Sequence, residues 1–156
     1  RVSETSIDFI RGTMRTVVVC ALLGCQTALR LMGPGGVIVN IASAAAMRPG
    51  PAAISYGMSK AAVVNLTQAV ASHCIAAKLN VRCNAICPGG IDTPMSERIL
   101  SGPDAQGLRQ QLKGSSVTSD LGQPEEIAAV VTFLLSSKAA FMTGASIIVD
   151  GGFSLL

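Results

Sequence analysis

Aromatic and charged residues are scarce in this chain. Tryptophan is absent, tyrosine occurs once, and only 13% of the 156 residues are charged. The 49% hydrophobic content excludes a disordered chain, and the low charge favours a sheet covered on both faces or a surface buried against partners. With 16 glycines and few aromatic side chains, the core must form by close backbone packing.

The sequence also lacks the features of several function classes. Its net charge is +3 without a run of Lys or Arg, which argues against a nucleic-acid partner. It begins with Arg1, no charged-then-apolar leader follows, and the apolar run Val17–Leu23 is too short to span a bilayer. We therefore expect a cytoplasmic protein with neither nucleic-acid nor membrane partners.

The cysteines form no recognisable pattern. Their number is odd and no CxxC pair occurs, which argues against a disulfide framework and against a zinc site, so no metal site is expected. We interpret them as small buried hydrophobic residues in a reducing compartment; they are Cys20, Cys25, Cys74, Cys83 and Cys87.

Helical and strand patterns alternate along the chain. Apolar residues recur at three- and four-residue steps over residues 5–32, which predicts a long helix with two buried faces. Further helices are predicted over residues 55–78 and from Pro124, a residue suited to a first helical position, to about Ser136. The runs that predict strands are Val37–Ile41, Leu79–Ile86 and Ser146–Val149.

This order predicts an α/β fold with a parallel sheet. No repeat or linker divides residues 1–156, so we expect a single domain. Three strands are few for a doubly wound sheet, and the strand at 37–41 would keep an open apolar edge. We therefore expect part of a Rossmann-like, doubly wound domain that lacks its N-terminal strands. The polar segment 94–118 predicts short helices in a lid.

Chemistry-bearing residues stand where the strands are expected to end. Ligands of open parallel sheets bind beyond the carboxyl ends of the strands, and Ser43 follows the first strand. Tyr56 and Lys60 are four residues apart and share a helix face. A phenol has a pKa of about 10, and a neighbouring ammonium lowers it toward the range useful for acid–base catalysis. Tyr56 could then exchange a proton with a substrate oxygen held by Ser43, while a cofactor bound by Lys60 supplies the hydride.

A serine thirteen residues before the tyrosine of YxxxK resembles the active-site signature of the short-chain dehydrogenase/reductase family. YxxxK alone is a weak signal, but four further segments resemble the family pattern in the same order. They are VIVNIAS at 37–43, RCNAICPGGIDT at 82–93, GQPEEIA at 122–128 and FMTGASIIVDGG at 141–152. The resemblance covers nearly the whole chain and is typical of the C-terminal part of the classical branch.

The resemblance implies an oxidoreductase that uses NAD or NADP to interconvert a secondary alcohol and a ketone. Ser43, Tyr56 and Lys60, which we call the trio, would be its catalytic residues. The nicotinamide end of the cofactor would be bound by Tyr56 and Lys60 together with Pro88, Gly89, Ile91 and Thr93. The helices at 5–32 and 55–78 would pair with those of a second subunit in a homodimer or homotetramer, and residues 94–118 would cover a small-molecule substrate.

Structural roles compete with these functional ones. Ser43 could cap a turn at the end of the strand. Thr93 could cap the lid helix and also bind the cofactor. A solvated position for Lys60 is disfavoured by its spacing from Tyr56. The single histidine, His73, is expected in mid-helix with a structural or exposed role.

Two departures from the family pattern leave other functions open. No glycine-rich phosphate loop is present, so the chain alone is expected to be inactive and to bind cofactor poorly. Val17 replaces the family's first-helix asparagine, and Thr16 beside it either partly substitutes or leaves the proton relay weakened.

The alternative is a catalytically impaired member, or a fragment that acts as an oligomerisation partner. A sugar-nucleotide epimerase or dehydratase also uses YxxxK, but the Asp150-Gly151-Gly152 ending favours the classical branch.

Overall fold

The computed structural model describes residues 2–51, 53–102, 105–106 and 121–155. Within them, three parallel strands form one sheet in the order β1-β2-β3. The strands are β1 (Val37–Ile41), β2 (Arg82–Pro88) and β3 (Ser146–Val149). This topology confirms the prediction of an α/β fold with a parallel sheet.

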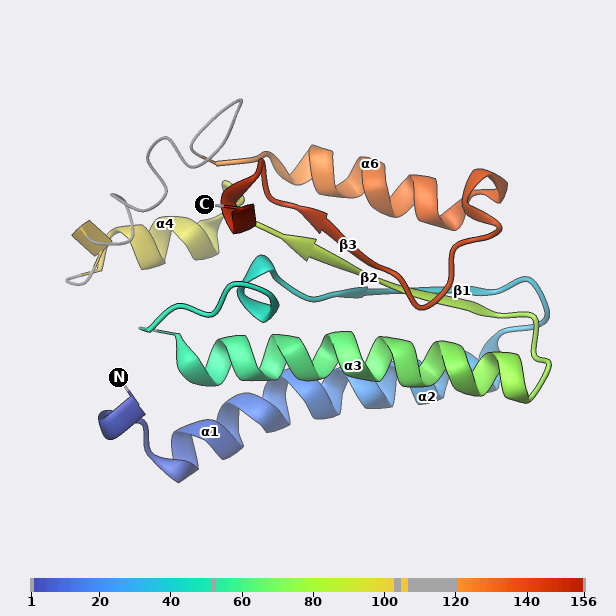
Figure 1. Cartoon of the computed structure of the whole chain (residues 1–156), viewed down its shortest axis with the longest axis horizontal. Helices are drawn as coiled ribbons and strands as arrows, with labels where there is room; N and C mark the ends of the chain where they lie inside the picture. Colours follow the sequence, from blue (N-terminus) through green and yellow to red (C-terminus); the bar gives the residue numbers. More distant parts are fainter. Residues whose placement is uncertain (1, 52, 103–104, 107–120, 156) are drawn as a thin grey trace.

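Helices cover both faces of the sheet (Figure 1). On one face, α3 (Ile54–Ala76) lies beside the long helix that contains α1 (Ile7–Met14) and α2 (Cys20–Leu31), and α6 (Pro124–Leu135) covers the other face. The short helix α4 (Pro94–Leu100) follows β2. Single turns complete the described chain: η1 (Val2–Glu4), η3 (Ala44–Ala46), η4 (Ser137–Ala139) and η5 (Phe153–Leu155).

The long first helix is not uniform. The helix predicted over residues 5–32 is confirmed from Ile7 to Leu31, but at its centre η2 (Arg15–Val19) forms a π-helical turn between α1 and α2. A π turn inserts one extra residue into the helix and shifts the face that follows, and such turns are frequent at functional sites. The turn contains Val17, the position at which the family resemblance leads us to expect asparagine.

The connection between α3 and β2 departs from the predicted boundaries. Helix α3 ends at Ala76 instead of residue 78, and β2 begins at Arg82 instead of Leu79. Lys78 and Asn80 adopt left-handed backbone conformations, with φ of 53° and 52°. Neither a right-handed helix nor an extended strand can continue through such residues, so both elements stop short of them.

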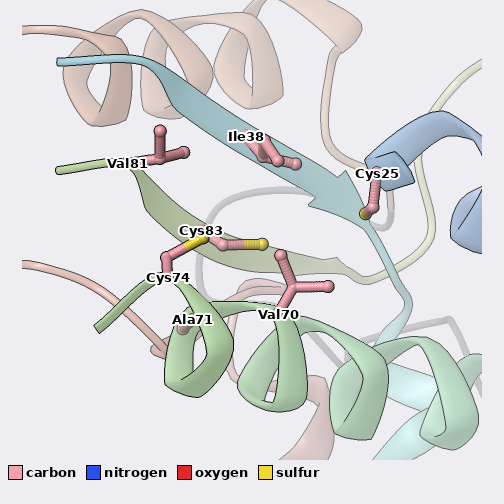
Figure 2. Close-up of a cluster of buried hydrophobic side chains, with 7 residues drawn as sticks. All are labelled: Cys25, Ile38, Val70, Ala71, Cys74, Val81 and Cys83. Carbon is pink, nitrogen blue, oxygen red and sulfur yellow. The ribbon is translucent and has the colours of Figure 1, made fainter. Parts of the chain in front are cut away.

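Small side chains fill the space between helices and sheet. Figure 2 shows one such cluster, formed where α2, α3 and the first two strands meet; it contains Cys25, Ile38, Val70, Ala71, Cys74, Val81 and Cys83. Burial raises the pKa of Cys74 and of Cys87, which keeps both as thiols at neutral pH. Four of the five cysteines are buried as predicted, but Cys20 is exposed, because it lies on the outer face of the first helix.

The outer face of the first helix exposes large apolar side chains. Residues with exposed fractions between 39% and 82% are Ile7, Phe9, Val19, Leu22, Leu23 and Leu31. By length and composition alone, the helical stretch Ile7–Leu31 is long and apolar enough to cross a membrane. The sequence expectation considered only the shorter run Val17–Leu23. One such helix is weak support for a membrane span, and the opposite face of this helix packs against the protein core through Val17, Ala21 and Cys25.

Candidate functional site

The carboxyl ends of the three strands lie at one end of the sheet, where α3 also begins (Figure 1). Ser43 follows β1 by two residues, and Tyr56 and Lys60 occupy the first two turns of α3. The structure therefore places the whole trio at the same end of the sheet. This is the position that the parallel topology led us to expect.

Ser43 is held by contacts with the main chain. Its Oγ accepts a hydrogen bond from the N–H of Ala45 at 3.2 Å, so the predicted capping role is present at the start of η3. Burial raises the pKa of the Cys87 thiol, and the neighbouring main chain of Ser43 opposes this rise. A hydroxyl that accepts one bond still has its proton to donate, so Ser43 remains able to bind a substrate oxygen.

Lys60 connects α3 to the strand that precedes Ser43. Its Nζ donates to the carbonyl of Ile41 at 2.9 Å and lies 5.7 Å from the centroid of the Tyr56 ring. Burial lowers the pKa of this half-buried ammonium, and the neighbouring Cys87 opposes the change. An ammonium has three donors, so two remain after the bond to Ile41.

The turn that carries Tyr56 packs directly on the loop after Ser43. The hydroxyl of Ser59 donates to the carbonyl of Tyr56 at 2.8 Å. A Cβ at Gly57 would lie 3.1 Å from the carbonyl oxygen of Ala45, so the residue after the tyrosine must be small for the loop to approach. The Tyr56 side chain is 38% exposed, which leaves its phenol accessible to a ligand.

A second hydrogen bond holds β1 against α3. Asn40 Nδ2 donates to the hydroxyl of Thr67 at 2.9 Å, and that hydroxyl donates to the carbonyl of Val63 at 2.8 Å. Thr67 is fully buried, two helical turns beyond Lys60. Sequence reasoning missed this link, although a lone asparagine in a β-branched strand was a signal for it.

The segment after β2 is fitted tightly against the end of β3. The strand ends at Pro88, and a Cβ on Gly89 would lie 2.8 Å from the Cα of Asp150. Ile91 then forms an isolated parallel bridge with Gly122. The residues predicted to bind the nicotinamide end of a cofactor are thus held at the same end of the sheet as the trio.

Thr93 caps α4. Its hydroxyl accepts a hydrogen bond from the N–H of Ser96 at 3.3 Å, and its own N–H donates to the Ser96 hydroxyl at 2.9 Å. The predicted helix cap is therefore present, and α4 confirms a short helix in the first part of the expected lid. Residues 103–104 and 107–118 of that expected lid lie outside the described residues.

The π turn supplies no polar side chain at the expected relay position. Val17 packs against the apolar cluster that contains Ala42 and Cys87. Thr16 is exposed, and both residues border an open depression of about 440 Å³ on the first helix.

The C-terminal turn contributes contacts that the sequence did not reveal. Arg48 Nη1 donates to the carbonyl of Phe153 at 2.6 Å, and its guanidinium carbon lies 4.5 Å from the centroid of the Phe153 ring. The two residues are 105 positions apart and belong to no shared motif, so no local signal pairs them.

Asp150 shapes the start of that turn. Its carboxylate accepts the N–H of Gly152 at 2.9 Å and the N–H of Ser154 at 2.8 Å. Burial raises the pKa of Asp150, but the hydrogen bonds from Ser154 and Gly152 outweigh burial and leave the pKa below its usual value.

Similar proteins are dehydrogenases and reductases. The family model described as enoyl-(acyl carrier protein) reductase matches residues 1–154. The chain is 33% identical to a 7alpha-hydroxysteroid dehydrogenase of Bacteroides fragilis, in an alignment that covers 99% of the chain and 58% of the relative. It is 37% identical to a 2-(R)-hydroxypropyl-CoM dehydrogenase of Xanthobacter autotrophicus, over 97% of the chain and 60% of the relative.

Solved structures share the fold. A mutant of the Serratia marcescens short-chain dehydrogenase/reductase is 36% identical, with a TM-score of 0.84 over 97% of this chain and 59% of that one. A 4-hydroxyisoleucine dehydrogenase mutant complexed with NADH and succinate is 30% identical, with a TM-score of 0.82 over 99% and 63%. An angucycline C-6 ketoreductase with bound NADP is 28% identical, with a TM-score of 0.84 over 99% and 57%.

The chain spans 58% and 60% of the length of the two curated relatives, and it aligns with them over almost all of its own length. The observed sheet therefore corresponds to part of a larger Rossmann-like domain in those proteins, as the fold prediction required.

Proposed function

Because the chain belongs to the short-chain dehydrogenase/reductase family, we propose that it is the C-terminal part of an NAD(P)-dependent oxidoreductase that interconverts a secondary alcohol and a ketone. One observation carries the proposal. The Lys60 ammonium lies 5.7 Å from the ring centroid of Tyr56 and is hydrogen-bonded to the strand that leads to Ser43. An acid–base group, its activating charge and a hydroxyl donor are thus linked at one end of the sheet.

Each member of the trio has a distinct role in this reaction. Tyr56 gives its phenolic proton to the carbonyl oxygen during reduction and removes the hydroxyl proton during oxidation. Lys60 places a positive charge 5.7 Å from the centroid of the Tyr56 ring, where it stabilises negative charge that develops on the phenolic oxygen as the proton moves. Ser43 donates a hydrogen bond to the same substrate oxygen and so orients the carbonyl.

The donors present fit the nicotinamide end of an NAD(P) cofactor. Lys60 keeps two donors beyond its bond to Ile41, and these suit ribose hydroxyls. The carboxamide would meet the backbone of Ile91 and the hydroxyl of Thr93. That hydroxyl would then bind the carboxamide in addition to capping α4. When bound, the cofactor supplies the hydride, because no side chain can. The remaining contacts would come from Tyr56, Pro88 and Gly89.

The pyrophosphate of such a cofactor needs a glycine-rich loop at a helix N-terminus, and this sequence contains none. The solved relatives carry NADH in one case and NADP in another, which supports a nicotinamide cofactor without selecting between the two. The complete protein is therefore proposed to bind the cofactor, while residues 1–156 alone would bind it poorly.

Replacing Tyr56 by Phe in the complete protein tests the catalytic assignment. We expect turnover to fall by about 10²-fold or more, because the proton donor is lost, while cofactor affinity stays within about twofold. Steady-state turnover of NAD(P)H with ketone panels and a fluorescence titration of the cofactor measure the two effects. Met58→Leu, at an exposed position two residues along α3, is the control and should change neither. Unchanged turnover in Tyr56→Phe would contradict the assignment.

A catalytically impaired oligomerisation partner is the second candidate, and one observation favours it. The π turn places the apolar Val17 where the family resemblance implies an asparagine. A complete protein that assembles and binds cofactor, yet turns over no alcohol or ketone, would support this candidate over an active enzyme.

A further inference from the structure

The C-terminal turn η5 lies at the carboxyl end of the sheet, beside the loop that follows Ser43 (Figure 1). Arg48, in that loop, makes two contacts with Phe153: a hydrogen bond of 2.6 Å to the carbonyl and a stacking contact of 4.5 Å on the ring. A guanidinium can do both at once because it is planar and carries several donors, whereas an ammonium is a compact point charge.

The turn is braced at its other end by the segment after β2. Gly151 and Gly152 have φ of 62° and 92°, so the chain reverses there in a conformation that glycine adopts without strain. The Asp150 carboxylate secures the reversal because it accepts hydrogen bonds from the N–H groups of Gly152 and Ser154. Asp150 also packs against Gly89, where no Cβ would fit. Arg48 therefore joins the loop after β1 to η5, and η5 is itself held against the segment after β2. We call this contact between Arg48 and Phe153 the junction.

This junction adjoins the proposed active site. Arg48 is five residues beyond Ser43, and the same loop contacts the turn of α3 that carries Tyr56. Apolar side chains flank both partners of the contact: Met47 is 44% exposed and Leu155 is 88% exposed. Each of the two segments joined by Arg48 therefore carries an exposed apolar residue within two positions of the contact.

We propose that Arg48 is a positioning residue that holds η5 as a wall of the substrate site, and that this wall favours alcohols and ketones with a bulky apolar body. The inference rests on the proposed oxidoreductase function for its kinetic consequence. Loss of the Arg48 contact frees the wall but leaves Ser43, Tyr56 and Lys60 in place. Substrate affinity therefore falls more than the rate of the chemical step.

Hydrogen exchange in the complete protein tests the hold on the turn. In Arg48→Ala, we expect the amides of residues 153–155 to exchange at least about fivefold faster, because local opening becomes easier, and Arg48→Lys to recover part of the protection. Lys138→Ala, which removes a cation on η4 at the far end of α6, should leave these amides unchanged. Equal exchange in Arg48→Ala and wild type overturns the inference.

Kinetics with two ketones tests the effect on specificity. For a bulky apolar cyclic ketone, Arg48→Ala should raise KM about tenfold and leave kcat within about twofold; for a small polar ketone, both constants should stay within about twofold. A parallel loss of kcat for both ketones overturns the positioning role, as does an unchanged KM for the apolar one.

The two proposals fail in distinguishable ways. Retained turnover in Tyr56→Phe rejects the oxidoreductase mechanism, and the exchange measurement on Arg48→Ala still decides whether the turn is held. In that case, the affinity for the same apolar ketone is measured by calorimetric titration in place of KM. Equal affinity in wild type and Arg48→Ala then overturns the specificity that we infer.

Discussion

Several side chains at the carboxyl end of the sheet combine a structural contact with a chemical one. Lys60 donates to the carbonyl of Ile41 and keeps two donors, and the Ser43 hydroxyl accepts a bond from Ala45 and keeps its proton. The structural bond fixes where the group lies, and the spare donors remain for a ligand. Such preorganised groups need little rearrangement when a substrate or cofactor binds.

Asp150 provides a test at the same scale, because hydrogen bonds from Ser154 and Gly152 hold its folded-state pKa below the usual aspartate value. A carboxylate with a depressed pKa stabilises the fold above its unfolded-state pKa, and this stabilisation is lost as pH falls through the folded-state value. At pH 7 we expect Asp150→Asn to lower the free energy of unfolding by about 1 kcal/mol, through weaker bonds to the Gly152 and Ser154 amides. Below pH 3.8 the difference from wild type should shrink.

Urea denaturation of the complete protein over this pH range measures both effects. Asp92→Asn, which changes an exposed carboxylate after the second strand, serves as the control and should cost little at either pH. A difference between wild type and Asp150→Asn that grows on acidification would contradict the expected direction of the pH dependence.

At the scale of elements, side chains from one element secure the end of another. Arg82, the first residue of β2, donates to the carbonyls of Leu134 at 2.9 Å, Met142 at 3.3 Å and Ser136 at 3.4 Å. The last carbonyls of a helix have no partner within it and carry the negative end of its dipole. Arg82 therefore caps α6 and ties it to the sheet.

Arg82→Met keeps the length of the side chain and removes this cap. We expect the free energy of unfolding to fall by about 1–3 kcal/mol, because part-buried carbonyls lose a charged donor. Chemical denaturation of the complete protein measures the change. Lys138→Ala, in the turn directly after α6, should stay within about 0.5 kcal/mol of wild type, and an equal loss in both variants would contradict a specific cap.

At the scale of the whole molecule, the first helix exposes large apolar side chains. Leu22 and Leu23 are 39% and 54% exposed, and exposed side chains continue to both ends of the helix. Exposed apolar side chains that gather in one patch mark interaction sites. We propose that this face and α3 pair with the same elements of a second copy, as the family resemblance implies.

Leu23→Glu tests this pairing, because an interface with two-fold symmetry would bury the new charge twice. We expect the complete protein to shift toward a smaller species in analytical ultracentrifugation. Phe141→Glu, at a fully exposed apolar residue outside the two helices, is the matched control and should leave the sedimentation unchanged. Identical sedimentation of wild type and both variants would reject the proposed interface.

Much of this architecture could be predicted from local signals. The runs at Val37–Ile41 and Ser146–Val149 are strands with the predicted bounds, because their β-branched side chains favour an extended backbone. Tyr56 and Lys60 share a helix face because their spacing matches one turn. Parallel topology then places Ser43 at the same end of the sheet.

Other features arose only from packing between distant segments. The π turn at Arg15–Val19 and the left-handed residues Lys78 and Asn80 interrupt patterns that are regular in sequence. The Arg48–Phe153 contact and the bond from Lys60 to the Ile41 carbonyl follow from where the loops and helices meet. Periodicity and residue spacing determined the elements and the trio, since both act over a few residues. The tertiary structure decided how those residues are held, because main-chain carbonyls and side chains far apart in the chain become neighbours only when the sheet and its helices assemble.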